Sequence, residues 1–78
     1  MNRDEVIKRI TPIAREVFDK PDLQLVDELD ATQVDTWTSL AFMQLLGKIE
    51  AEFGFKFKMM ELLGIRNIGT LVDAIAKH

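Results

Sequence analysis

Residues 34–54 read VDTWTSLAFMQLLGKIEAEFG, and this stretch decides the fold. A polar segment ends at Trp37, and apolar side chains then recur at helical spacing up to Phe53. Gly54 follows, a residue type that commonly ends a helix. The stretch therefore predicts a helix over residues 39–53. Its predicted core-facing side chains are Phe42, Leu45, Leu46, Ile49 and Phe53.

Ser39 lies at the junction between the polar segment and this helix. The first turn of a helix has free backbone N–H groups and the positive end of the helix dipole, which together favour a bound or attached phosphate. Serine is also a preferred N-cap residue, so a purely structural role is the competing interpretation. Trp37 is most simply explained as an anchor for the preceding loop.

Composition limits what the chain can be. Its 78 residues predict one small domain, residues 1–78, with a modest core. There is no cysteine, which excludes disulfides, thiolate metal sites and cysteine nucleophiles and favours the cytoplasm. No apolar run approaches the length of a membrane span, so we expect no membrane insertion. The net charge of −3 argues against a nucleic-acid partner.

The negative charge is concentrated before Ser39. Residues 21–38 hold five acidic side chains and no basic one, whereas residues 39–78 hold five basic and four acidic ones. A solvated loop explains this distribution, and an acidic surface that attracts a basic partner enzyme explains it equally well.

The remaining segments predict an all-α fold, a small four-helix bundle with a long loop over residues 20–38. An amphipathic pattern indicates a first helix over residues 3–19, which Pro12 either kinks or divides in two with Thr11 as a second cap. A short apolar third helix is expected over residues 59–63, without a good N-cap residue. The last helix is expected over residues 68–77, capped by Asn67 or, in an alternative frame, by Thr70 with Asp73.

Several other chemistries are disfavoured. A Ser–His–Asp triad would require His78, the only histidine, at the last position of the chain. The acidic residues at 22–30 lack the spacing of a calcium loop. Met43, Met59 and Met60 are most simply explained as adaptable core filler.

The pattern as a whole resembles the acyl carrier protein family. The residues that carry the resemblance are Trp37-Thr38-Ser39-Leu40, then Glu50-Ala51-Glu52-Phe53-Gly54-Phe55, then Ile65-Arg66-Asn67-Ile68-Gly69-Thr70-Leu71. The resemblance implies a non-enzymatic carrier whose Ser39 receives a 4′-phosphopantetheine arm from coenzyme A. The thiol of this arm carries an acyl group as a thioester between enzymes. In some relatives the acyl chain enters the core, which suggests as pocket residues Leu45, Leu46, Ile49, Leu62 and Leu63.

Two departures from the family pattern indicate a specialised member. Thr38 stands where the family usually has an aspartate that the phosphopantetheinyl transferase reads. The second helix is also less acidic than usual, so acyl-activating or acyl-transferring enzymes are expected to dock more by apolar contact than by charge. The expected partner-binding residues are Thr38, Leu40, Ala41, Met43, Gln44 and Glu50.

One alternative from another class stays open. A degenerate carrier fold that is never modified would act only as a protein-binding module, and Thr38 and the apolar side chains of the second helix support it. A small hydrolase is a distant third interpretation because the chain lacks a general base. We expect a monomer whose cargo is an acyl, aminoacyl or hydroxyacyl unit.

Overall fold

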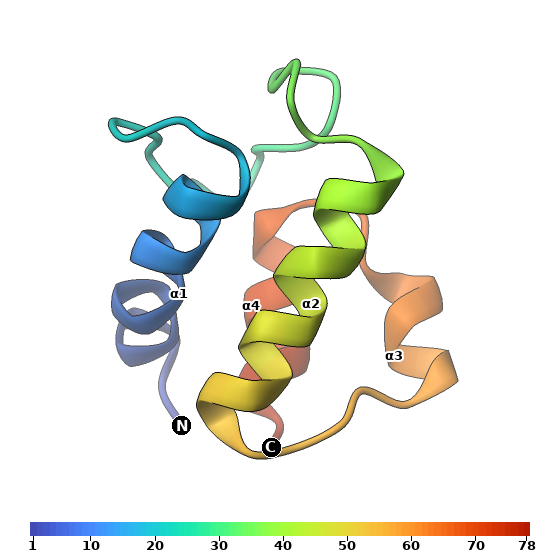
Figure 1. Ribbon diagram of the computed structural model, residues 1–78. Coiled ribbons are helices and arrows are strands. Elements are labelled where there is room, and N and C mark those ends of the chain that lie inside the picture. The colour runs from blue at the N-terminus through green and yellow to red at the C-terminus, as the bar shows by residue number, and fades with distance from the viewer.

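The computed structural model describes residues 1–78, whose regular structure consists of helices α1 (Arg3–Val17), α2 (Ser39–Phe53), α3 (Met59–Gly64) and α4 (Ile68–Ala76). The predicted all-α fold of three longer helices and one short one is therefore confirmed. In Figure 1, α3 stands at the side of the molecule and the long loop after α1 lies at the end opposite the two termini. The N-terminal ammonium group lies 3.4 Å from the carbonyl oxygen of Ala76, so the termini are close in space. None of the helices combines the length and hydropathy needed to cross a bilayer.

Helix α1 runs unbroken through Pro12, which excludes the alternative of two helices divided there. Proline removes the N–H that would bond to the carbonyl of Lys8. One residue earlier, the Thr11 hydroxyl donates to the carbonyl of Ile7. The helix ends at Val17, two residues before the predicted boundary, because Asp19 adopts a left-handed conformation with φ of 54°.

The core forms where α1, α2 and α4 meet. Its fully buried side chains come from helical positions that share one face of each helix. They are Val6, Ile10 and Ala14 of α1, Leu45 and Ile49 of α2, and Ile68, Leu71, Val72 and Ile75 of α4, with Phe18 just after α1. α3 contributes no buried residue.

The long loop is held by backbone hydrogen bonds to the first turn of α4. The N–H groups of Ile68 and Gly69 donate to the carbonyls of Leu29 and Asp27 at 2.9 and 3.0 Å. Gly69 permits this approach, because a Cβ there would lie 3.0 Å from the Cβ of Asp27. Within the loop, the N–H of Leu29 donates to the carbonyl of Val26 and closes a turn.

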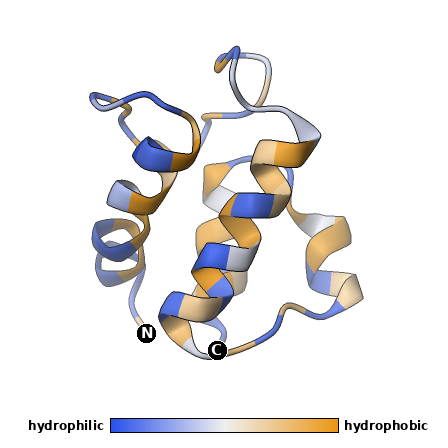
Figure 2. Cartoon of the chain, viewed as in Figure 1, coloured by the Kyte–Doolittle hydropathy of each residue, from blue (hydrophilic) through white to orange (hydrophobic).

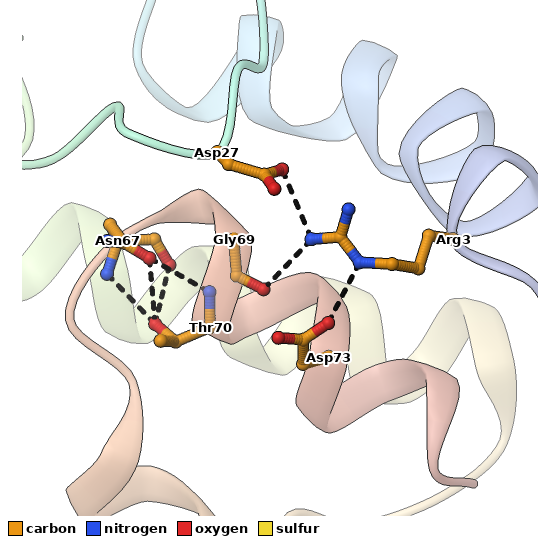
Figure 3. Close-up of polar contacts among 6 residues, drawn as sticks. All are labelled: Arg3, Asp27, Asn67, Gly69, Thr70 and Asp73. Atoms are coloured by element: carbon orange, nitrogen blue, oxygen red, sulfur yellow. Dashed lines mark hydrogen bonds and ion pairs between the residues drawn. The ribbon is translucent and has the colours of Figure 1, made fainter.

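Arg3 links the loop to two helices, as Figure 3 shows. Its guanidinium group donates to Asp73 of α4 at 2.8 Å, to Asp27 of the loop at 3.1 Å and to the carbonyl of Gly69 at 3.3 Å. The hydrogen bonds to Asp27 and Asp73 raise the pKa of Arg3 above its ordinary value. Asp73 therefore pairs with Arg3. The alternative capping box for α4, formed by Thr70 with Asp73, is not found.

Side-chain caps begin the last two helices. Asn67 accepts from the N–H of Thr70 at 2.9 Å, which confirms Asn67 as the cap of α4. The N-cap residue of α3, Lys58, forms no cap hydrogen bond with its side chain, as expected. The Glu61 carboxylate instead accepts from the backbone N–H of Lys58 at 2.7 Å. This bond, with a smaller contribution from His78, lowers the pKa of Glu61.

Candidate functional site

Thr38 and Ser39 divide two tasks at the start of α2. The Thr38 hydroxyl accepts from the N–H of Ala41 at 3.1 Å, and the Thr38 carbonyl accepts from the N–H of Phe42 at 2.9 Å. Thr38 is therefore the N-cap, and Ser39 is the first helical residue. The structural interpretation of Ser39 as a cap is wrong, because the cap is already supplied. The exposed Ser39 side chain has no partner within the protein.

The helix start around Ser39 is electropositive. The N–H groups of Ser39 and Leu40 have no acceptor, since the cap satisfies only the next two. The first turn of α2 holds no acidic side chain, whereas that of α1 holds Asp4 and Glu5. No side chain of this turn therefore neutralises the positive end of the α2 dipole. These free donors fit the oxygens of a phosphodiester on Ser39.

A stack of three aromatic rings fixes the start of α2. The Trp37 ring stacks on Phe18 with centroids 5.0 Å apart and on Phe42 with centroids 5.8 Å apart. The Thr36 hydroxyl donates to the carbonyl of Phe18, which ties the end of the loop to the end of α1. Trp37 is thus the loop anchor that the sequence predicted, and it holds the backbone two residues before Ser39.

The acidic loop is partly neutralised near the site. Lys20 lies 2.9 Å from the carboxylate of Asp35 and, by hydrogen bonding and charge, lowers the pKa of that group. Asp22 and Glu28 are exposed and have no basic partner. Ser39 therefore follows a loop that keeps part of its negative charge free.

Most of the predicted partner-binding residues are exposed. Leu40 and Met43 of α2 are each 68% exposed, and Thr38 and Gln44 are exposed as well. Ala41 differs, because it is only 9% exposed and belongs to the core cluster.

Glu50 also differs from the prediction. Its side chain is 20% exposed and accepts from the N–H of Phe57 at 2.8 Å. It thereby holds the connection between α2 and α3, and is not a free docking charge.

The five predicted pocket residues do not lie together in the structure. Leu45 and Ile49 are fully buried in the core, and Leu46 packs against it half-buried. Leu62 is half-buried outside the core cluster, and Leu63 is 68% exposed. In this structure Leu62 and Leu63 therefore do not line a pocket with the α2 residues.

Two features were missed by sequence reasoning. Met59 and Met60 are 69% and 79% exposed, so neither is core filler. The exposure of Met43 likewise excludes core filling and leaves its other predicted role, partner binding. His78 is held in place: its Nε2 lies 2.8 Å from Glu61, and its ring stacks on Phe55 at 4.0 Å between centroids. No local pattern signals a contact between positions 61 and 78.

Comparison with known proteins gives this site its context. Residues 5–75 match the family model described as a phosphopantetheine attachment site. The chain belongs to the acyl carrier protein family. An acyl carrier protein of Saccharopolyspora erythraea is 27% identical over 73 residues, covering 94% of this chain and 77% of that protein. The solution structure of a holo acyl carrier protein from Geobacter metallireducens is 36% identical and superposes with a TM-score of 0.86, covering 92% of this chain and 83% of that one.

Family membership settles the kind of work this carrier protein does. It is a carrier and not an enzyme, and its prosthetic group is a covalently attached phosphopantetheine. Acyl carrier proteins work with a phosphopantetheinyl transferase and with enzymes that handle acyl groups.

Proposed function

We propose that Ser39 is the attachment site of 4′-phosphopantetheine. The carrier would then deliver an acyl intermediate between enzymes of a specialised fatty acid, polyketide, lipid or polysaccharide pathway. One observation supports the site above all: the Ser39 hydroxyl is exposed and unbonded beside the two free N–H groups of an uncompensated helix start.

The residues around Ser39 have defined roles in this proposal. The Ser39 oxygen forms a bond to the phosphorus next to pantetheine in coenzyme A and loses its proton. The pyrophosphate bond breaks and adenosine 3′,5′-bisphosphate leaves. The free N–H groups of Ser39 and Leu40 stabilise the negative oxygens of the resulting phosphodiester. Thr38 and the Trp37 stack hold this turn in place. The attached arm supplies a terminal thiol that the cysteine-free chain lacks.

The proposed setting follows from the same features. The absence of cysteine supports work in the cytoplasm. The partners would be acyl-activating or acyl-transferring enzymes, and we expect the carrier to be a monomer. Exposed Leu40 and Met43 next to Ser39 support docking by apolar contact.

Intact-mass measurement tests the attachment site. The protein is incubated with coenzyme A and a broad-specificity phosphopantetheinyl transferase, and a second sample is isolated from its native host. We expect a gain of one phosphopantetheine that is absent from Ser39→Ala. Ser39 is the only serine of the chain, so the control for loss of a hydroxyl is Thr32→Ala. Thr32 is exposed in the preceding loop, and this variant should still be modified.

The second candidate function is an unmodified protein-binding module. Thr38 in the place of the usual aspartate and the exposed side chains of α2 support it. No mass gain in either sample, together with unchanged function of Ser39→Ala in the host, would establish this alternative.

A further inference from the structure

Helix α3 has an apolar surface that nothing in the chain covers. Met59, Met60 and Leu63 are between 68% and 79% exposed. Met59 and Leu63 are four residues apart and Met60 and Leu63 are three apart, so these side chains lie on one side of the helix. The hydropathy colouring of Figure 2 shows the predominantly apolar helix directly after a segment of alternating polar and apolar residues.

Basic side chains border this apolar group in the sequence at both ends of the helix. Lys56 and Lys58 precede α3 and Arg66 follows it by two residues, and all three are exposed. The six residues of α3 span about 9 Å, so these cations flank a short helix closely. Lys56 forms a long ion pair with Glu50 at 3.9 Å, and Lys58 and Arg66 form no ion pair. We call residues 56–66 the α3 face.

The nearby acidic groups are already engaged. Glu50 accepts from a backbone N–H, Glu52 pairs with Arg9 at 3.0 Å, and Glu61 binds both the cap of α3 and His78. Residues 56–66 contain three basic residues and one acidic residue, Glu61, so the α3 face carries a formal charge of +2, although the whole chain carries −3. The face thus has the opposite sign to the loop at residues 21–38.

This combination points to a particular kind of partner. A second copy of the chain docked through the same face would oppose cations with cations, which disfavours self-association. An apolar centre with a cationic border matches a surface of the opposite border charge.

We propose that the α3 face docks a partner protein whose contact surface is apolar and bordered by aspartate or glutamate. The exposed Leu40 and Met43, which follow Ser39 on α2, favour a protein that works on the arm over a lipid surface. The proposal deepens the carrier function and rests on it for its purpose, but the docking itself requires no modification of Ser39.

Two designed peptides test the charge preference. Both are 14-residue amphipathic helices with the same leucine face; one is flanked by glutamates and the other by lysines. Binding is followed by NMR of the methionine methyl groups, where Met59 and Met60 report on the α3 face and Met1 near the C-terminus is the internal control. We expect the glutamate peptide to shift Met59 and Met60 and to bind about three- to tenfold more tightly than the lysine peptide.

Substitutions locate the effect on the molecule. Arg66→Glu and Lys8→Glu change the net charge equally, but Lys8 is an exposed, unpaired residue of α1. Arg66→Glu should reduce the preference for the glutamate peptide by at least twofold, and Lys8→Glu should leave it unchanged. Met60→Gln with Leu63→Gln should weaken binding of both peptides about equally.

Two results would overturn the proposal. One is equal binding of both peptides or equal effects of the two charge reversals. The other is binding to vesicles with one-third phosphatidylglycerol without binding to either peptide, which would assign the face to an anionic membrane. Because all of these measurements use the unmodified protein, their failure is separate from a failure of Ser39 to gain mass.

Discussion

At the scale of single residues, Thr38 replaces the aspartate that is usual in the family. The structure shows the role of the threonine. Its hydroxyl caps α2 and leaves the neighbouring serine free. Aspartate is an equally good cap, so the departure is not explained by helix stability. The difference between the two residues is a negative charge beside Ser39.

Substitutions at Thr38 separate capping from charge. Thr38→Ala should lower the free energy of unfolding by about 1 kcal/mol because the N–H of Ala41 loses its acceptor. Thr38→Asp should keep the stability within about 0.5 kcal/mol and raise the rate of modification by a transferase that reads aspartate. Urea unfolding and timed intact-mass assays measure the two effects. A slower reaction of Thr38→Asp would show that the charge does not guide the transferase.

The candidate site was predictable from local residues and its surroundings were not. Ser39 was identified because a loop, a serine and a helical pattern are consecutive in the sequence. Ala41 was misplaced because an apolar residue at the edge of a helical stripe can face either way, and packing decides. Glu50 was expected to be free because its partner, the N–H of Phe57, lies beyond the end of the helix.

At the scale of elements, α2 contains a glycine in its interior that lowers the stability of the helix. Gly47 is exposed in the helix interior, and a Cβ there would meet no atom within 4 Å, so close packing does not explain this glycine. Gly47→Ala should raise the free energy of unfolding by about 0.5–1 kcal/mol.

Gly54 provides the matched control in the same helix. It follows α2 with φ of 75°, a conformation that costs other residues about 1–2 kcal/mol. Gly54→Ala should therefore destabilise the protein although space is available. Urea unfolding compares the variants, and stabilisation by both would contradict this assignment of their roles.

Helix α3 depends on a carboxylate and should respond to pH. The pKa of Glu61 is lowered in the folded protein, first by the N–H of Lys58 and then by His78. Glu61 therefore stabilises the fold above the ordinary glutamate pKa of about 4.3 and loses this effect as the pH falls through its folded-state pKa. Glu61→Gln should be less stable than wild type at pH 7, and the difference should vanish in acid.

Unfolding midpoints in urea between pH 3 and pH 7 measure this dependence. Glu28→Gln is the control, since Glu28 is exposed and unpaired in the loop. A constant gap between Glu61→Gln and wild type across this range would exclude the ionised carboxylate as its source.

The helices were predicted well because their signals are local. Asn67 and Gly54 mark a start and an end within a few residues of the apolar pattern, and both are found there. The end of α1 was predicted two residues too late because Asp19 adopts a left-handed conformation where the loop begins. The exposure of Met59 and Met60 was missed because it depends on where α3 lies against the bundle.

At the scale of the whole molecule, Arg3 connects segments that are far apart in the sequence. Arg3→Met keeps the apolar stem of the side chain but removes its bonds to Asp27, Gly69 and Asp73. The loop should then separate more often from α4. We expect faster hydrogen exchange at the amides of Ile68 and Gly69, which donate to loop carbonyls.

Lys8→Met is the control for this prediction, because Lys8 is an exposed residue of the same helix without an ion pair. Exchange rates at Ile68 and Gly69 that match in Arg3→Met and Lys8→Met would show that the arginine does not hold the loop. A general rise across all helices would instead indicate global destabilisation.

The aromatic stack also gives the protein an optical property. The chain contains one tryptophan and no tyrosine, so its near-ultraviolet emission originates almost entirely from the ring of Trp37. That ring lies between Phe18 and Phe42, two residues before Ser39. An unlabelled sample therefore carries a fluorophore at the candidate attachment site, and the wavelength and intensity of its emission can follow in real time any event that disturbs that turn.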